Sequence, residues 1–227
     1  MLITNANLVT WEKPNRILKD HAIFTTDGRI QEIGPQLDLI ARHPHEERLD
    51  AEGQYVMPGL ICAHTHFYGA FARGMAIPGS PARNFVEILQ KLWWRLDRVL
   101  DEESIRLSAE VCLVDAIRHG TTTLIDHHAS PTCIDGSLDI IAEVVQQAGV
   151  RVCECYEVTD RNGSSGANAG IAENVRFAKK LAAQPSPLLA TSFGLHASLT
   201  LGNETIERSV AEARSLGVGF HVHVAED

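Results

Sequence analysis

Two histidines stand two residues apart, at positions 64 and 66, at the end of the apolar run of residues 59–66 (GLICAHTH). Side chains alternate along a β-strand, so residues two apart point to the same face and one cation can reach both imidazole rings. Neutral imidazole is a common ligand of catalytic divalent metals. We therefore predict that His64 and His66 bind a metal ion; the alternative is a pair of solvated histidines at a strand end.

A second pair of histidines, His221 and His223, ends another apolar run and is followed by Glu226. This cluster can supply both a metal ligand and a proton carrier, because a carboxylate beside a metal-activated water can take its proton and pass it to a leaving group. Glu226 is the candidate for that catalytic role. Strict alternation would put Glu226 on the opposite face from His223, so the strand must end near Val224 and turn the carboxylate inward.

The elements that must position these clusters follow from the hydrophobic pattern. Residues 1–56 contain short strand-like runs with a turn at Asp27-Gly28, and we predict that they form the N-terminal part of a small β-sandwich domain. In residues 57–227, apolar β-branched runs alternate with helical stretches, as in βα units that build a parallel sheet. The helix around residues 105–116 should begin at an N-cap, Asp101, and stop at Gly120. The expected barrel strands cover residues 60–66, 121–127, 150–156, 188–195 and 219–224.

The predicted fold class is therefore α/β: a TIM-like (β/α)8 barrel, incomplete here, after the small β domain. A complete barrel typically needs roughly 250 residues, whereas residues 57–227 suffice for about five βα units. An open parallel sheet of that size would expose a long edge. We therefore expect a truncated sequence, the alternative being completion by another chain.

Composition limits the possible partners. The chain has 227 residues, of which 44% are hydrophobic and 22% charged, as in globular domains with a sizeable core. Its formal net charge of −9, with no cluster of Lys and Arg, predicts no nucleic acid partner. No apolar run approaches the roughly 20 residues of a membrane span, and no signal peptide is recognisable. We expect a cytoplasmic homo-oligomer with reduced cysteines that acts on a small-molecule substrate without contacting a membrane.

Together these segments resemble the amidohydrolase superfamily, in its deaminase and chlorohydrolase-like branch. The resemblance covers essentially the whole chain and is carried by residues 56–60 (VMPGL), residues 64–66 (HTH), residues 120–123 (GTTT) and the H-x-x-E motif of residues 223–226. It implies that His64, His66 and His223 are metal ligands, that Glu226 is the acid/base and that His196 contacts the substrate. The family also uses a histidine after the sixth strand and an aspartate after the eighth. Neither strand is present here, so we expect this chain alone to bind metal weakly and to turn over nothing.

The predicted activity is metal-dependent hydrolysis of a carbon–nitrogen bond that is not a peptide bond, through a metal-activated water. The expected reaction is deamination of an amino-substituted heterocycle or amidine. Chlorohydrolase-type dehalogenation and a catalytically silent metal-binding scaffold are the alternatives. The fourth-strand region, residues 188–199, contains no lysine that could be carboxylated to bridge two metals, which favours a single divalent ion. We expect zinc; ferrous iron also suits such ligands.

Several other residues have two interpretations. Trp93, in a helical insert after the first strand, can line a pocket for a flat ring or pack in the core, and Arg73 can contact substrate or be solvated. We assign both to substrate binding. One of His127 and His128 can support the site, or both can be ordinary polar residues at a strand end. Residues 160–170, rich in Gly, Ser and Asn, can form a mobile lid or a plain connector.

Overall fold

The computed structural model describes residues 1–226, which divide into two compact units, Met1–Gly59 and a second that begins at Leu60. The first unit is a small sheet in the order β3-β2-β1-β4, with β5 also pairing with β1. Asp27 and Gly28 both have positive φ, 51° and 70°, as a two-residue hairpin turn requires, so the predicted turn is confirmed. The elements of this unit are β1 (Leu2–Val9), β2 (Ile17–Thr26), β3 (Arg29–Pro35), α1 (Gln36–Arg42), β4 (Arg48–Asp50) and β5 (Tyr55–Val56).

The second unit is built on parallel strands. One sheet has the order β6-β7-β8-β9, and β10 and β11 form a second parallel pair. A parallel bridge between Val158 and Leu195 connects the chain after β8 to β10. Because parallel strands end at one edge, the residues that follow them gather there. The strands are β6 (Leu60–Thr65), β7 (Thr121–Asp126), β8 (Arg151–Glu154), β9 (Leu189–Thr191), β10 (Phe193–Ala197) and β11 (Phe220–His223).

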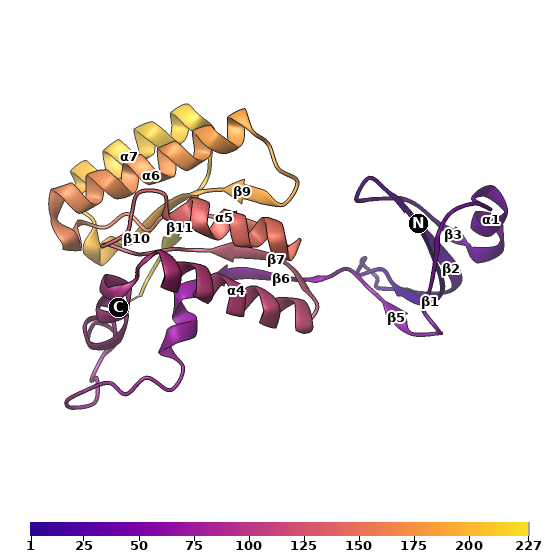
Figure 1. Ribbon diagram of the computed structural model, residues 1–227, viewed down its shortest axis with the longest axis horizontal. Coiled ribbons are helices and arrows are strands. Elements are labelled where there is room, and N and C mark those ends of the chain that lie inside the picture. Colours follow the sequence, from indigo (N-terminus) through magenta and orange to yellow (C-terminus); the bar gives the residue numbers. More distant parts are fainter. Residues whose placement is uncertain (227) are drawn as a thin grey trace. The chain divides into compact units, whose positions relative to one another are not determined.

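Four long helices connect these strands: α4 (Glu102–Arg118), α5 (Ser137–Ala148), α6 (Gly163–Ala183) and α7 (Asn203–Leu216) (Figure 1). The N-cap of α4 is Asp101, whose side chain accepts a hydrogen bond from the backbone N–H of Ser104 at 2.9 Å. Gly120 follows the end of α4 with a φ of 75°. Both predicted helix boundaries are therefore confirmed. The inner side of α4, with Ile105 and Leu113, packs into the main buried core.

The segment between β6 and α4 contains only short helices. It begins with the 3-10 helix η1 (Phe67–Ala72) and continues through α2 (Phe85–Ile88) and the π-helical turn η2 (Leu89–Trp93). The short helix α3 (Trp94–Leu96) and the 3-10 turn η3 (Asp97–Val99) complete it. This segment is the predicted helical insert.

Two details differ from the sequence-based expectation. The fourth strand is not continuous over residues 188–195: it is interrupted at Ser192, so that β9 pairs with β8 and β10 lies against the chain that follows β8. Residues 160–170 are neither a lid nor a plain connector, because Asp160–Asn162 form the 3-10 turn η4 and the glycine-rich residues that follow are the first turns of α6. Burial of Ala167, Gly170 and Ile171 against the sheet overrides the low helix propensity of this composition.

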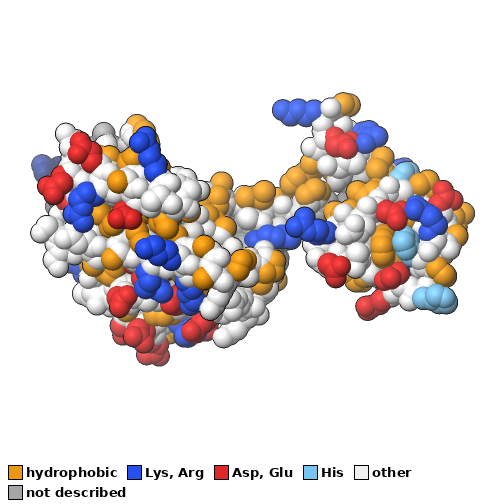
Figure 2. Space-filling model, turned by 90° about the horizontal axis from the view of Figure 1, so that it is seen from above, with side chains coloured by type: hydrophobic (Ala, Val, Ile, Leu, Met, Phe, Trp, Pro, Cys, Tyr) orange, Lys and Arg blue, Asp and Glu red, His pale blue; other side chains and the backbone are white. Residues whose placement is uncertain are grey.

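Two surface properties of the chain bear on its partners. On the visible face of the second unit, acidic and basic side chains lie among hydrophobic ones, and both signs of charge are present (Figure 2). No helix within residues 1–226 is long and apolar enough to span a membrane.

Candidate metal centre

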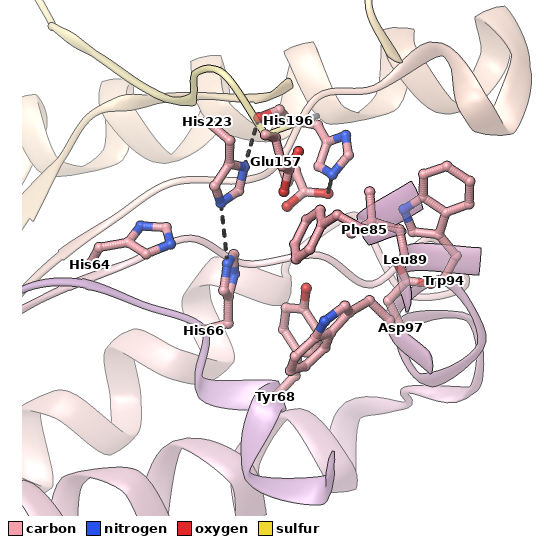
Figure 3. Close-up of a pocket in the computed structure, with 12 residues that line it drawn as sticks. His64, His66, Tyr68, Phe85, Leu89, Trp94, Asp97, Glu157, His196 and His223 are labelled. Atoms are coloured by element: carbon pink, nitrogen blue, oxygen red, sulfur yellow. Dashed lines mark hydrogen bonds and ion pairs between the residues drawn. The ribbon is translucent and has the colours of Figure 1, made fainter. Parts of the chain in front are cut away.

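The histidines predicted from the sequence meet at the carboxyl ends of the parallel strands, around a cavity of about 240 Å³ (Figure 3). One side of the cavity carries imidazoles from β6, β10 and β11 and the residues just beyond them; we call His64, His66, His196 and His223 the histidine wall. The opposite side comes from the segment between β6 and α4; we call Tyr68, Phe85, Leu89, Trp93 and Trp94 the aromatic wall. The remaining lining residues are Asp97, Glu157 and Glu226.

The central pair of the histidine wall is His66 and His223. The Nδ1 of His66 lies 2.6 Å from the carbonyl oxygen of His127, and the Nδ1 of His223 lies 2.7 Å from that of His196. A carbonyl can only accept, so each Nδ1 carries the hydrogen, and in the Nδ1–H tautomer each Nε2 has a free lone pair. These two Nε2 atoms face each other at 3.3 Å.

This arrangement fits a bound cation. Two facing lone pairs repel each other, and no proton lies between them in this tautomer. Two nitrogens bound to one zinc at roughly 2.0–2.1 Å in tetrahedral geometry lie about 3.3 Å apart. The separation of the two Nε2 atoms equals that spacing. The carbonyl partners also hold the rings in the orientation that metal binding needs.

His64 completes a possible ligand set. One nitrogen from each of His64, His66 and His223 lies within 4.8 Å of the other two. Burial lowers the pKa of His66 to about 4, and burial also lowers the pKa of His64. Both rings are therefore neutral near pH 7, which is the form that binds a metal. The Nδ1 of His64 lies 2.8 Å from the Nε2 of His221, which leaves its Nε2 for a metal.

Glu226 lines the same cavity as His223. β11 ends at His223, and Ala225 has a positive φ of 55°, so the chain turns sharply before Glu226. This is the turn that the sequence required. The buried Oε2 of Glu226 has no hydrogen-bond partner within residues 1–226, and burial raises the pKa of this carboxyl group. A raised pKa suits a group that must both take and give a proton near neutral pH.

Glu157, which sequence reasoning missed, lies in the floor of the cavity with a side chain 4% exposed. Its Oε2 is 3.2 Å from Nδ1 of His127, and its Oε1 is 3.7 Å from Nε2 of His196. Burial alone would raise the pKa of Glu157, but contact with His127 and the positive charge available on His127 and His196 keep it below its usual range. Glu157 is therefore ionised inside the cavity. It follows β8 as the histidines follow their strands, so the same strand-end argument identifies it.

His196 lies where the resemblance implied, among the cavity residues. Its Nδ1 is 2.5 Å from the hydroxyl oxygen of Thr200, so the Nε2 side of the ring faces Glu157. His127 and His128 are both fully buried. His127 contacts the site through its carbonyl and through Glu157, whereas Nε2 of His128 lies 2.9 Å from the hydroxyl oxygen of Ser130.

The aromatic wall is held in place by a buried ion pair. Arg161 contacts Asp97, and the side chains of these residues are 6% and 1% exposed. The guanidinium carbon of Arg161 also lies 5.3 Å from the centre of the Trp94 ring, within cation–π range. Trp93, predicted to bind substrate, is part of this wall, with its ring perpendicular to that of Tyr68 at 6.2 Å.

Arg73 is the predicted substrate residue that the structure does not bring to this site. It is exposed and lines a different cavity, together with Cys62, Cys112 and Asp115. The 3-10 helix η1 ends just before Arg73, and the backbone there is extended, which takes this residue away from the histidine wall. A loop position after the first strand is therefore not enough to bring this side chain to the cavity.

Comparison with known proteins adds the following findings. A sequence profile described as the amidohydrolase family matches residues 55–227. The chain is 29% identical over 226 residues to a 5-methylthioadenosine/S-adenosylhomocysteine deaminase of Moorella thermoacetica, covering 100% of this chain and 49% of that protein. It is 32% identical to the protein of the same name from Desulfitobacterium hafniense, covering 99% and 49%. The chain thus spans about half the length of the curated relatives it matches.

Solved structures give the same picture of the fold. An adenosine deaminase from Xanthomonas campestris with bound zinc superimposes with a TM-score of 0.76 at 23% identity, covering 98% of this chain and 48% of that one. An atrazine chlorohydrolase from Arthrobacter aurescens, also complexed with zinc, gives a TM-score of 0.73 at 22% identity, covering 98% and 52%.

Proposed function

This chain belongs to the amidohydrolase family, and from that premise we propose that its cavity is the metal-binding part of an active site that hydrolyses carbon–nitrogen bonds other than peptide bonds. His64, His66 and His223 are the proposed ligands of one divalent metal ion, and Glu226 is the proposed catalytic acid/base. His196 and Trp93 are the proposed substrate contacts. Arg73 is left out because it lies at another cavity.

The observation that carries this proposal is the 3.3 Å separation of the two facing Nε2 atoms of His66 and His223, each with its Nδ1 hydrogen given to a backbone carbonyl. A structural role alone would favour a tautomer in which one ring donates to the other. Two lone pairs held face to face instead favour a cation between them. Zinc is the proposed metal, because imidazole nitrogen at tetrahedral spacing suits it; ferrous iron binds similar ligands.

In the proposed reaction, a zinc ion bound there would supply a water whose pKa is lowered toward neutrality. Glu226, with its unpartnered buried oxygen, would take the proton of that water and deliver it to the departing nitrogen. The Nε2 side of His196 would contact the substrate. The aromatic wall would hold a flat ring between the histidines and the solvent.

Deamination of an amino-substituted heterocycle or amidine is the proposed reaction, in preference to displacement of chloride. The relatives from Moorella thermoacetica and Desulfitobacterium hafniense, at 29% and 32% identity, carry the name of a deaminase. The chlorohydrolase is similar at 22%, a level at which the likeness concerns the fold. A catalytically silent scaffold is disfavoured by Glu226, since a purely structural metal site closes its coordination and needs no adjacent acid/base.

The finer features of the fold and context are also proposals. We propose that the parallel strands of the second unit are part of a TIM-like (β/α)8 barrel and that residues 1–56 are part of a β-sandwich. The parallel strand order and the TM-score of 0.76 to a zinc-containing deaminase support the barrel. A cytoplasmic location, homo-oligomeric assembly and the absence of a nucleic acid partner stay predictions from the sequence.

The activity is tested by product release from the whole protein loaded with zinc. Aminopyrimidines, aminotriazines and aromatic amidines are assayed for ammonia, and chlorinated triazines for chloride. We expect ammonia from the amino compounds, and a fall in rate of about a hundredfold or more in Glu226→Gln with zinc content unchanged. The matched control is Glu207→Gln, which removes the same charge from an exposed position on α7. Release of neither product, or unchanged turnover in Glu226→Gln, would overturn the proposal.

A further inference from the structure

Glu157 is a charged side chain that the proposed hydrolysis does not use. Its backbone is fixed on both sides: the N–H of Glu157 donates to the carbonyl of His128 at 2.7 Å, and the N–H of the next residue, Val158, donates to the carbonyl of Gly194 at 3.2 Å. The side chain is 4% exposed and lines the cavity. In Figure 3 the Glu157 carboxylate points into the space between His223, His196 and Phe85. The fixed backbone limits the positions that this carboxylate can take, which favours binding of a ligand there.

The two oxygens of Glu157 have different surroundings. Oε2 lies 3.2 Å from Nδ1 of His127, at ion-pair distance. Oε1 has His196 Nε2 at 3.7 Å, which is too far for a hydrogen bond. Oε1 is therefore an acceptor with room for a donor from a bound molecule. A carboxylate oxygen in this position can accept a charge-assisted hydrogen bond from a ligand that brings an N–H group.

The remaining charges of the cavity point the same way. Its acidic residues are Asp97, Glu157 and Glu226, and no Lys or Arg is among the residues that line it within 1–226. The charge of Asp97 is balanced by Arg161. Facing Glu157 across the cavity are the rings of the aromatic wall, whose π faces attract cations. A negatively charged group placed beside Glu157 would meet its carboxylate with no Lys or Arg side chain among these lining residues to balance it, because the proposed metal ion is bound on the histidine wall.

We propose that Glu157 selects the substrate: a flat cation of the amidinium or guanidinium class, or a protonated amino-heterocycle, binds with one N–H on Oε1 and its plane against the aromatic wall. This proposal rests on the proposed function and deepens it. The metal and Glu226 carry out the reaction, whereas Glu157 determines which charge a substrate must carry in order to bind. A phosphate or carboxylate beside that N–H group would be repelled by the Glu157 carboxylate.

Binding of two molecules of nearly equal shape tests the proposal without any substitution. Benzamidine is a cation and benzamide is neutral. Calorimetric titration of the zinc-loaded whole protein is expected to give benzamidine an affinity about ten- to a hundredfold higher than benzamide. Equal affinity of the two, or tighter binding of benzamide, would overturn the proposal.

Substitution then assigns the preference to one residue. Glu157→Gln should bind benzamidine and benzamide equally and keep its zinc, while Glu157→Asp should retain part of the preference because it keeps the charge. Glu207→Gln is the control for loss of one exposed negative charge. Loss of zinc from Glu157→Gln, or an intact preference in that variant, would contradict the assignment. These experiments measure binding affinity and not turnover. They therefore test the role of Glu157 even if the protein releases no ammonia, which is the result that would contradict the proposed function.

Discussion

The histidine wall and the aromatic wall of the cavity are built in different ways. The histidine wall is local in design: each ring lies at or just beyond the end of a parallel strand, and backbone carbonyls of neighbouring strands fix the rings of His66 and His223. The aromatic wall comes from the short helices between β6 and α4, and the contact between Asp97 and Arg161, which are 64 residues apart in sequence, helps to hold it.

The difference implies separate roles for the two walls. Strand ends in a packed parallel sheet are rigid, which is what a metal site needs, because ligand positions must hold to a fraction of an ångström. In a wall made of short helices, side chains can be substituted with little effect on the positions of the strands. We therefore expect the reaction to depend on the histidine wall and the choice of substrate to depend on Glu157 and the aromatic wall.

The substitution with the largest expected effect on stability tests whether the two walls are independent of each other. Arg161→Met removes the partner of buried Asp97 and the cation above Trp94, so we expect a loss of about 3–5 kcal/mol in the free energy of unfolding. Zinc affinity of the folded protein should stay unchanged. Urea unfolding and zinc titration measure the two. Arg106→Met is the control, since its pair with Glu143 is largely solvent-exposed and should cost less than about 1 kcal/mol. Equal losses in both variants would mean that Arg161 does not anchor the wall.

The next effect concerns the histidine wall. A Cβ at Gly194 would lie 2.2 Å from the carbonyl oxygen of Tyr156, so Gly194→Ala must push β10 away from the chain after β8. We expect a loss of about 1–3 kcal/mol in stability and weaker zinc binding, because the carbonyl of His196 orients His223. Gly219→Ala, with nothing within 4 Å of the new Cβ, is the control. Wild-type stability in Gly194→Ala would show that the two strands are not held this closely.

The sequence predicted the histidine wall well because the period of a strand and the common end of parallel strands are local rules. The shared face of His64 and His66 follows from them, whereas His223 is predicted from the family resemblance and the turn that brings Glu226 inward departs from strand alternation. Glu157 also follows the end of a parallel strand, but no sequence motif marks it as a metal ligand or a catalytic residue. The aromatic wall could not be predicted in this way, since the contact between Arg161 and Asp97 joins distant segments and leaves no periodic pattern.

The same reasoning explains the misassigned segments. Residues 160–170 have a composition typical of a loop, but burial of their small side chains makes them helical. Arg73 was assigned from its place after the first strand, and only the course of the backbone after η1 shows that it lies at another cavity.

A third, pH-dependent effect concerns the junction of the walls. Asp126, at the end of β7, accepts a hydrogen bond from the N–H of Phe67, the first residue of η1, at 2.7 Å. Burial raises the pKa of Asp126 to about 7. The folded state then holds a proton that the unfolded state releases above about pH 4, so stability falls as pH rises from 4 to 7. Asp126→Asn should remove this dependence, at most about 1.4 kcal/mol per pH unit, as measured by unfolding at a series of pH values. Parallel pH profiles for the two proteins would contradict it.

The smallest effect is expected at Arg73. Because this side chain is exposed and lines another cavity, Arg73→Ala should change stability by no more than about 0.5 kcal/mol. Benzamidine affinity, measured by calorimetry, should also be unchanged. A tenfold loss of affinity would return Arg73 to the substrate site and extend the aromatic wall toward it.

The most direct test of the central claim is a zinc titration of the whole protein, followed by calorimetry, with His66→Ala, His223→Ala and the exposed control His119→Ala. If the facing Nε2 atoms hold the metal, wild type and His119→Ala bind one zinc ion per chain with equal affinity. His66→Ala and His223→Ala should each lose at least about a hundredfold in affinity, since each removes a ligand. Unchanged zinc affinity and stoichiometry in both variants would contradict the claim.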